Sequence, residues 1–444
     1  MYPVFYLPYI TSGWIIAIIA TLHILPSHLS TSAMWFNVYM EYKAYKENRE
    51  ELLEFVKKFA LLLIVFAYVF GSLSGVGIWF ATMVASPRGI SSIIHNYVWG
   101  WATEWVFFII EVLGIFVYYY TFGKVDKKTH LIIGLIFAIG SWTTMAIIVG
   151  ILSFMISSGK WNINGNFFYG FFNPNYFPHF LLRTVLMFSI TALYAIFITN
   201  FVKNENVKNE VIKKASFLGI LSIIISIPFL YLYLKSLPSH SKEIFPLLIT
   251  KGLKTGFIIP LVITFLYFVL NIFSKFLTKF IPSLLMIVIF FVSIFAGERI
   301  REILRKPYII PGFIYSNCII GFDHKVKGVE SDISKSEGRG ILEIYPFTPS
   351  ELKSIDENNI LKAGKLIALI ECSSCHSLDK GGVRPLRALI KRMGLEDAES
   401  IMEFLDLMGE NYLYMPYFLG NEIEKRALAE YLISLKGGLK NGSF

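Results

Sequence analysis

The sequence predicts an all-α protein: a polytopic bundle of about eight transmembrane helices, followed by a small soluble helical domain. Three observations predict this fold class. Hydrophobic residues make up 55% of the 444 residues and charged residues only 16%, whereas soluble domains need more polar surface. The apolar residues gather in runs of roughly 20, the length at which a helix crosses about 30 Å of hydrocarbon. Beyond Gly321 the composition becomes polar and charged.

Eight apolar runs predict the spans, and each is long enough for a helix to cross the hydrocarbon once. They cover residues 12–40, 59–85, 98–122, 131–156, 180–202, 215–234, 256–272 and 281–296. The segment before the first run, residues 1–11, contains no lysine or arginine. Because a signal peptide has a positively charged start, we expect this segment to be a short external end rather than a cleaved signal.

Lysine and arginine residues alternate from loop to loop along the predicted bundle. One set of loops holds Lys43, Lys46, Arg49, Lys57, Lys58, Lys124, Lys127, Lys128, Lys203, Lys208, Lys213, Lys214, Lys275 and Lys279. The opposite loops hold Arg88, Lys160, Lys235 and Lys242. By the positive-inside rule the first set faces the cytoplasm, and both the N-terminus and the chain after the eighth span lie outside. The net charge of +9 thus fits a bacterial cytoplasmic membrane, and we expect no nucleic-acid partner.

The composition divides the chain into three parts. We expect a transmembrane domain over residues 1–320, a polar linker over 321–349 and a soluble domain, on the periplasmic side, over 350–444. Apolar residues return at helical spacing in the stretches 360–370, 386–393 and 422–435.

The soluble part contains one strong motif. Its residues are Cys372-Ser373-Ser374-Cys375-His376, the C-x-x-C-H pattern of covalent haem attachment. Two thiols one helical turn apart can each add to a vinyl group of the same porphyrin, while the adjacent histidine reaches the iron. The alternative is a redox or zinc C-x-x-C, which needs a second ligand pair. The third cysteine, Cys318, stands apart and is expected to be a free thiol.

A second axial ligand for such a haem is expected downstream of the motif. Met415 fits because it lies in a Met-Pro loop just before the last predicted helix, and a thioether raises the haem potential. Through these features, residues 350–435 resemble class I cytochromes c. The resemblance implies covalent haem c bound by Cys372, Cys375, His376 and Met415. Haem c is attached outside the cytoplasm, which agrees with the side that the lysine count gives.

Ionisable residues occur inside or next to several predicted spans. They are His23 and His28 in the first, Glu104 and Glu111 in the third, His179 and Arg183 at the outer end of the fifth, and Glu298 and Glu302 just beyond the eighth. Such groups are costly in a membrane and are functional hypotheses by default, with a helix–helix hydrogen bond as the alternative for each.

Several short matches accompany these residues. They are His23, Met40-Glu41, Phe107-Phe108-Ile109-Ile110-Glu111, Gly123-Lys124-Val125, His130, Gly140-Ser141, Asn173-Pro174 and Glu302-Ile303-Leu304-Arg305-Lys306-Pro307-Tyr308. In these residues and their spacing, residues 12–308 resemble subunit I of cytochrome bd-type quinol oxidases. The resemblance implies that His23 ligates the active-site high-spin haem, and that Glu302, or else Glu298, ligates the neighbouring haem b. Glu104 and Glu111 would belong to the proton path and haem edge, as catalytic residues.

The chain also departs from that family. The family's low-spin haem histidine falls at Leu182-Arg183, so His179, one turn earlier, is the substitute we consider, and the family's methionine partner has no counterpart in residues 251–257. The loop that forms the quinol site in the family is reduced to about residues 235–245. We therefore expect a soluble or membrane-bound cytochrome c-type donor, with electrons entering at haem c.

Three functions remain open from the sequence. The favoured one is a bd-like terminal oxidase subunit that reduces oxygen to water with haem c, haem b and either haem b or haem d at the active site. The second is a non-catalytic electron-transfer subunit, and the third is a transporter or sensor that carries a haem domain. The family resemblance implies a second membrane subunit as partner. His95, His240 and His324 are expected to be solvated, and His130 to be structural.

Overall fold

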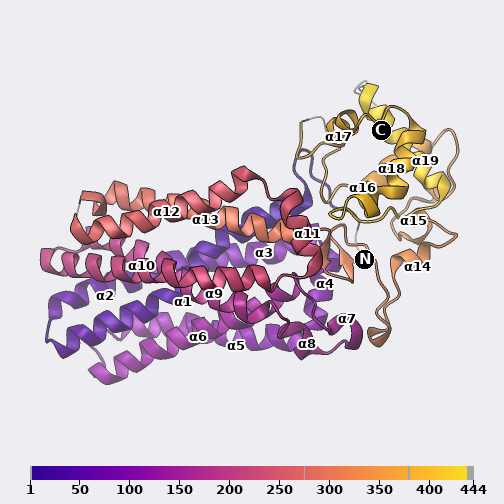
Figure 1. The fold of residues 1–444 in the computed structure, drawn as a ribbon. Helices are drawn as coiled ribbons and strands as arrows, with labels where there is room; N and C mark the ends of the chain where they lie inside the picture. The colour runs from indigo at the N-terminus through magenta and orange to yellow at the C-terminus, as the bar shows by residue number, and fades with distance from the viewer. Residues whose placement is uncertain (1–2, 275, 379–380, 438–444) are drawn as a thin grey trace.

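The computed structural model describes residues 3–274, 276–378 and 381–437. Lys275, which we assigned to a cytoplasmic loop, and residues 438–444 of the predicted soluble domain lie outside this part. Figure 1 shows a long bundle of helices with the C-terminal helices gathered at one of its ends. The N-terminal segment lies at the same end, between the two.

Eight helices in the described residues are long and apolar enough to cross a membrane. They are α1 (Ser12–Lys46), the continuous helix formed by α2 (Glu50–Leu62), the π-helix η1 (Leu63–Phe70) and α3 (Gly71–Ala85), then α5 (Val98–Tyr120), α6 (Lys127–Phe154), α9 (Tyr176–Ile198) with η2 (Thr199–Phe201), α10 (Glu205–Lys235), α12 (Lys251–Phe273) and α13 (Phe280–Leu304). The prediction of eight spans in an all-α chain is therefore confirmed.

The helix ends differ from the predicted ones for a physical reason. The eighth helix continues past Ala296 to Leu304, so Glu298 and Glu302, which we placed just beyond it, lie within it. Charged residues end an apolar run, but they do not interrupt the backbone hydrogen bonds of a helix. At the other ends, Asp126, Asn204 and Thr250 accept hydrogen bonds from first-turn N–H groups and fix the starts of α6, α10 and α12.

The bundle core is made of large aromatic side chains facing small residues. Phe55, Phe59 and Phe137 are fully buried. At Gly219 of α10, an added Cβ would lie 2.4 Å from the ring of Phe268 in α12. Only glycine permits this close approach, which draws the two helices together.

Short elements close the end of the bundle next to the C-terminal helices, which the charge pattern predicts to face outward and which is named the outer end; the opposite end is named the inner end. These are α4 (Pro87–Asn96), α7 (Trp161–Asn164), α8 (Phe167–Phe171), α11 (Ser239–Leu248) and a two-stranded antiparallel hairpin of β1 (Tyr308–Ile310) and β2 (Ile314–Tyr315). The inner end has η3 (Phe276–Thr278). At the outer end, His324 packs against Trp161, with its Nε2 3.1 Å from the Trp161 carbonyl, and is only 2% exposed. The expectation that His324 is solvated was wrong, whereas His95 is exposed as expected.

The C-terminal part is also helical. It contains η4 (Lys325–Lys327), α14 (Asp332–Ser336), α15 (Ile341–Ile344), η5 (Ser350–Leu352), α16 (Ile360–Glu371), α17 (Leu386–Met393), α18 (Ala398–Asn411) and α19 (Glu422–Gly437). Helices α16 and α19 cross at Gly364, where an added Cβ would lie 2.0 Å from the carbonyl oxygen of Ala427. Ile341, Leu342 and Tyr345 join the same hydrophobic core, which therefore extends N-terminal to Ser350.

Polar contacts fasten the C-terminal part to the outer end of the bundle. The Arg88 guanidinium binds both carboxylate oxygens of Asp332, at 2.6 and 3.1 Å. The Val4 amide donates to the Tyr345 hydroxyl, and the Val383 amide donates to the Tyr9 carbonyl. The N-terminal segment thus ties the first membrane helix to the residue that follows α15 and to the loop that follows α16.

Candidate functional site

The C-x-x-C-H motif forms one tight turn at the end of α16. The amides of Cys375 and His376 donate to the Cys372 carbonyl at 3.1 and 2.9 Å, so both thiols and the imidazole belong to a single turn. His376 Nδ1 lies 3.1 Å from the Arg384 carbonyl. Metal-binding histidines commonly use one ring nitrogen in this way and the other for the metal. Burial lowers the pKa of His376 to about 4, which keeps the imidazole neutral, the form that binds iron.

The two thiols have different surroundings. Burial raises the pKa of Cys372 well above its usual range. Burial is also the largest single effect on Cys375, but the ammonium of Lys306, 3.4 Å from its Sγ, acts together with Ser374, Arg384 and Ser316 and brings the pKa of Cys375 down to about 7. Since the thiolate is the nucleophile of cysteine chemistry, Cys375 is the more reactive of the pair before any attachment. All three cysteines are free of disulfides.

The Met415 loop is anchored to the same turn. The Met415 amide closes the loop on the Tyr412 carbonyl at 2.7 Å, and the side chain is half-buried. Four residues later, the Leu419 amide donates to the buried carboxyl group of Glu371, at 3.1 Å. Because Glu371 directly precedes Cys372, this bond holds the Met415 loop against the start of the motif. The arrangement suits a second axial ligand supplied by this loop.

His23 lies in the membrane between α1 and the continuous helix that follows it. Its Nδ1 is 3.0 Å from the Gly71 carbonyl and 3.2 Å from the Ser74 hydroxyl. The ring lies over Gly75, where an added Cβ would be 3.1 Å from Cε1. The π-helix η1 ends at Phe70, directly before Gly71, and such irregular turns are frequent at functional sites. As with His376, the contacts fall on Nδ1 and leave Nε2 as the nitrogen suited to iron.

A buried arginine cluster occupies the outer half of the bundle. Arg183 reaches His28 Nε2 at 3.1 Å, His179 Nε2 at 2.7 Å and Glu298 Oε1 at 2.5 Å. Arg301 holds the other Glu298 oxygen at 2.7 Å. The guanidinium of Arg183 therefore occupies His179 Nε2, while His179 Nδ1, the other nitrogen that could bind an iron, is buried without a partner in the described residues.

The second candidate carboxylate, Glu302, pairs with Arg299 one turn earlier on α13. Arg299 in turn lies over the Trp14 ring, 4.7 Å from its centroid. Glu298 and Glu302 are one turn apart on the same helix, and each is ion-paired. Glu302 has one arginine to displace and Glu298 has two, so Glu302 is the more readily freed for a metal.

Glu111 lies at the centre of a polar cluster drawn from four helices. Tyr68 donates to Glu111 Oε2 at 3.0 Å, and Ser30 lies 3.4 Å from the same oxygen. Ser30 also contacts the Ser141 hydroxyl at 3.0 Å. Glu104 lies two turns earlier on α5 and is half-buried. Sequence reasoning found both carboxylates but not Ser30, Tyr68 or the role of Ser141, since only the packing of α1, η1, α5 and α6 brings them together.

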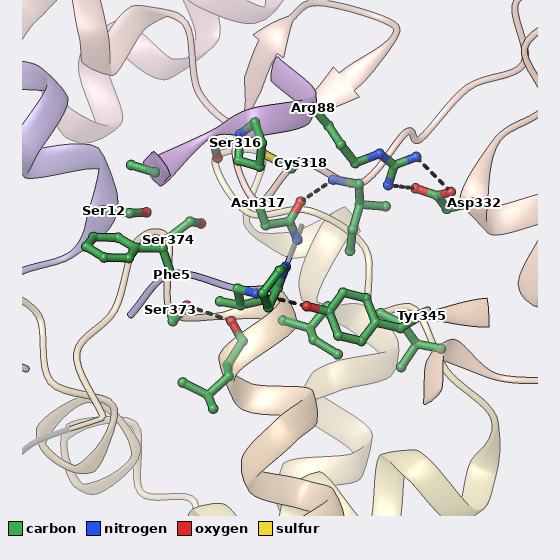
Figure 2. Close-up of a pocket in the computed structure, with 18 of the residues that line it drawn as sticks. Phe5, Ser12, Arg88, Ser316, Asn317, Cys318, Asp332, Tyr345, Ser373 and Ser374 are labelled. Carbon is green, nitrogen blue, oxygen red and sulfur yellow. Dashed lines mark hydrogen bonds and ion pairs between the residues drawn. The ribbon is translucent and has the colours of Figure 1, made fainter. Parts of the chain in front are cut away.

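A cavity of about 90 Å³ lies beside the motif, where the N-terminal segment, the end of α3 and α16 meet. Figure 2 shows it in close-up, with the Arg88–Asp332 ion pair at its rim. Its labelled lining residues are Phe5, Ser12, Arg88, Ser316, Asn317, Cys318, Asp332, Tyr345, Ser373 and Ser374. The motif therefore borders the junction between the bundle and the C-terminal helices.

Within residues 3–274, 276–378 and 381–437, no cluster of three or more His, Cys, Asp or Glu side chains could hold a bare metal ion. This finding argues against the zinc alternative for the two cysteines, which requires further ligands close by. A haem needs fewer protein ligands because the porphyrin supplies four nitrogens.

Comparisons with known proteins bear on the fold. No family model matches the sequence, and no curated protein matches it. Among solved structures, the chain is similar to a chain of the bd oxidase from Geobacillus thermodenitrificans, with a TM-score of 0.59 at 13% sequence identity. The match covers 74% of this chain and 92% of the other. At this identity the likeness shows a shared fold, so the predicted resemblance to the bd oxidase bundle is confirmed at the level of the fold.

Proposed function

We propose that this protein is the haem-bearing subunit of a respiratory membrane complex. It accepts electrons through a covalent haem c and passes them to haem b or haem d groups in the bundle, where oxygen is reduced to water. The observation that carries the proposal is the contact between Lys306 and Cys375, which joins the haem-attachment motif to the end of the helix bearing Glu302. The bd oxidase fold of the bundle supports the same conclusion.

Each candidate residue has a proposed role in this function. Cys372 and Cys375 would attach haem c, and His376 and Met415 would bind its iron. His23 would hold the active-site haem and Glu302 the neighbouring one, with Glu298 and His179 as further candidates. Haem, when bound, would supply one-electron transfer and the chemistry of oxygen reduction. Glu111, which Tyr68 and Ser30 orient, and Glu104 carry protons toward that place.

The electron donor is proposed to be a cytochrome c-type protein rather than quinol. Between α10 and α12 the chain has only the short helix α11 and a few residues on either side, from Ser236 to Thr250. Tyr414, beside the Met415 loop, packs near Ile244 and Ile303 at this end of the bundle. This connection is therefore short, and Tyr414 of the C-terminal part packs against it, which leaves little room for a quinol site. A second membrane subunit would complete the complex.

The proposed function implies three domains in the chain and an orientation in the membrane. Residues 1–320 form the membrane haem domain, 321–349 the linker and 350–444 the cytochrome c domain. The membrane is the cytoplasmic membrane of a bacterium, with the cytochrome c domain on its periplasmic side, because the lysine-rich loops lie at the opposite end of the bundle.

One observation favours a second function, that of a non-catalytic electron-transfer subunit. Arg183 already binds the Nε2 atom of His179, so only Nδ1 of this substitute ligand is open to the expected low-spin haem. An electron-transfer subunit would need only haem c and one membrane haem. This alternative predicts that no haem in the bundle binds an external gas.

A spectroscopic experiment separates the two functions. The purified complex is reduced, its haems are counted as pyridine haemochromes, and its spectrum is recorded with and without carbon monoxide. Several non-covalent haems per haem c, one of them shifted by carbon monoxide, are expected for the oxidase. Haem c with only carbon-monoxide-silent haem b would refute the oxidase, and a preparation without haem c would refute both functions.

A further inference from the structure

A second set of buried ionisable groups lies at the inner end of the bundle, away from the candidate haem ligands. Glu41 and Tyr118 are fully buried and His130 is 1% exposed. The Tyr118 hydroxyl donates to Glu41 Oε2 at 2.5 Å, His130 Nδ1 binds Glu41 Oε1, and His130 Nε2 lies 2.8 Å from the Tyr118 carbonyl. A carboxyl group at this depth is costly. Hydrogen bonds among the three residues offset this cost. Among the described residues, none of the three contacts a candidate haem ligand.

These groups continue two columns that run up the bundle. Glu104, Glu111 and Tyr118 repeat every seven residues on α5, and His23, Ser30 and Asn37 repeat every seven residues on α1. Seven residues make about two helical turns, or ~10.5 Å, and return to nearly the same face. The columns face one another, since Ser30 contacts Glu111 and the Asn37 amide lies 3.4 Å from the Tyr118 hydroxyl.

The gap between the two polar levels carries unpaired acceptors. Asn37 Oδ1 at the lower level and Glu111 Oε1 at the upper level are buried without a hydrogen-bond partner in the described residues. Buried polar atoms that lack protein partners are commonly paired with ordered water. Two or three waters would span the roughly 10 Å between the levels. These two acceptors would be the ends of such a short water chain.

The lower level also reaches the inner surface. Tyr45 lies one turn beyond Glu41 on α1, is half-buried and sits against Glu41. Its ring lies 5.3 Å from the ammonium of Lys127, in the lysine-rich loop before α6. Tyr45, Lys127, Glu41, His130 and Tyr118 are thus the titratable groups that face the entrance, from α1, α5 and α6. Solvent at this surface is one side chain away from Glu41.

We infer that Glu41, His130 and Tyr118 form the cytoplasmic entrance of a proton path that leads through water at Asn37 to Glu111. The inference rests on the proposed oxidase and names the route that supplies it. One oxygen molecule takes four electrons, which enter through haem c, and four protons, which enter here, to give two water molecules. His130 suits this position because the Tyr118 carbonyl holds its Nε2–H, which leaves Nδ1 free to exchange a proton with Glu41.

The test compares proton uptake with haem content in the intact complex. Glu41→Gln and Tyr118→Phe are each prepared, together with Glu41→Asp and with Tyr267→Phe as a matched control. Tyr267 is a buried tyrosine of α12, 3% exposed, outside the columns. The reduced complex is mixed with oxygen, and proton uptake is followed with a pH dye while haem oxidation is followed optically.

We expect Glu41→Gln to slow proton uptake at least tenfold, Glu41→Asp to restore most of it, and Tyr118→Phe to slow it several-fold. Haem content, carbon monoxide binding and the first, proton-independent phase of haem oxidation should stay unchanged, as they do in Tyr267→Phe. A purely structural role would instead lower haem content and every rate together, and that pattern would overturn the inference.

Wild-type proton uptake in Tyr118→Phe and Glu41→Gln, with haem content intact, would also overturn it. If Glu41→Gln fails to assemble, Tyr118→Phe decides, because it removes only one hydroxyl group. A wild-type complex that binds carbon monoxide but reduces no oxygen would refute the proposed function itself. The wild-type measurement therefore distinguishes failure of the function from failure of the path.

Discussion

Gly364→Ala should break the contact that holds α16, and with it the C-x-x-C-H motif, against α19. The new Cβ would lie 2.0 Å from the Ala427 carbonyl oxygen and 2.7 Å from both the Ala427 carbonyl carbon and the Tyr431 Cβ. All three atoms are backbone or Cβ, so no flexible side-chain end can yield, and the helices must separate. Overpacking of this kind typically costs 1–3 kcal/mol, and the shortness of the contact places this case at about 3 kcal/mol.

That cost corresponds to a more than hundredfold shift between folded and unfolded forms, and to a fall in Tm of about 10–20 °C for a unit of this size. Thermal proteolysis of the solubilised protein, detected through a C-terminal tag, measures it. Gly381→Ala is the control, since its new Cβ has no neighbour closer than 4.0 Å. Equal melting of Gly364→Ala and Gly381→Ala would refute the packing argument.

Three further predictions follow from single sites. Burial raises the pKa of Glu371 well above its usual 4.5. Above that pH, folding therefore takes up a proton at Glu371. The stability that this group contributes is complete below about pH 4.5 and is lost as the pH rises toward the folded pKa. Thermal proteolysis should show this decline between pH 5 and pH 8 in the wild type and a flatter profile in Glu371→Gln, and equal slopes would contradict it. Glu424→Gln should lower the stability of the C-terminal helices by about 1–3 kcal/mol, because Glu424 accepts the amides of Ile341 and Leu342, both at 2.8 Å, and urea unfolding with Glu422→Gln as control would detect it. His23→Ala should abolish the carbon-monoxide-sensitive haem band while leaving haem c at its wild-type amount, and an unchanged band in His23→Ala, with exposed His95→Ala as control, would exclude His23 as its ligand.

The membrane part was predictable because its signal is local. Each span is an apolar run, and a run of that length is stable in lipid as an α-helix, because the helix satisfies every backbone hydrogen bond within the segment. The end of the eighth helix was missed because Glu298 and Glu302 interrupt hydropathy but not helical hydrogen bonding. Hydropathy therefore finds where a helix leaves the membrane core, and not where it ends.

Contacts between segments that lie far apart in the chain could not be predicted from the sequence. His324 was expected in solvent, yet it packs on Trp161, 163 residues earlier in the chain. The cluster at Glu111 needs four helices to meet, and its members Ser30 and Tyr68 are common residue types with no distinguishing pattern. The contact of Lys306 with Cys375 likewise depends on how the C-terminal helices sit on the bundle. The C-x-x-C-H motif was readable because its chemistry needs adjacent residues.

The opposite placement of Cys375 and Glu41 has an energetic consequence. Cys375 lies at the outer end of the bundle and Glu41 at the inner end, with Glu111 between them. In the proposed function, electrons come from one side and protons from the other, so each electron that meets a proton moves one net charge across the membrane. Against 100 mV that transfer stores about 2.3 kcal/mol, or roughly 9 kcal/mol for the four charges of one oxygen molecule. The enzyme would act as a generator of membrane voltage, and the voltage it builds would in turn slow its own respiration.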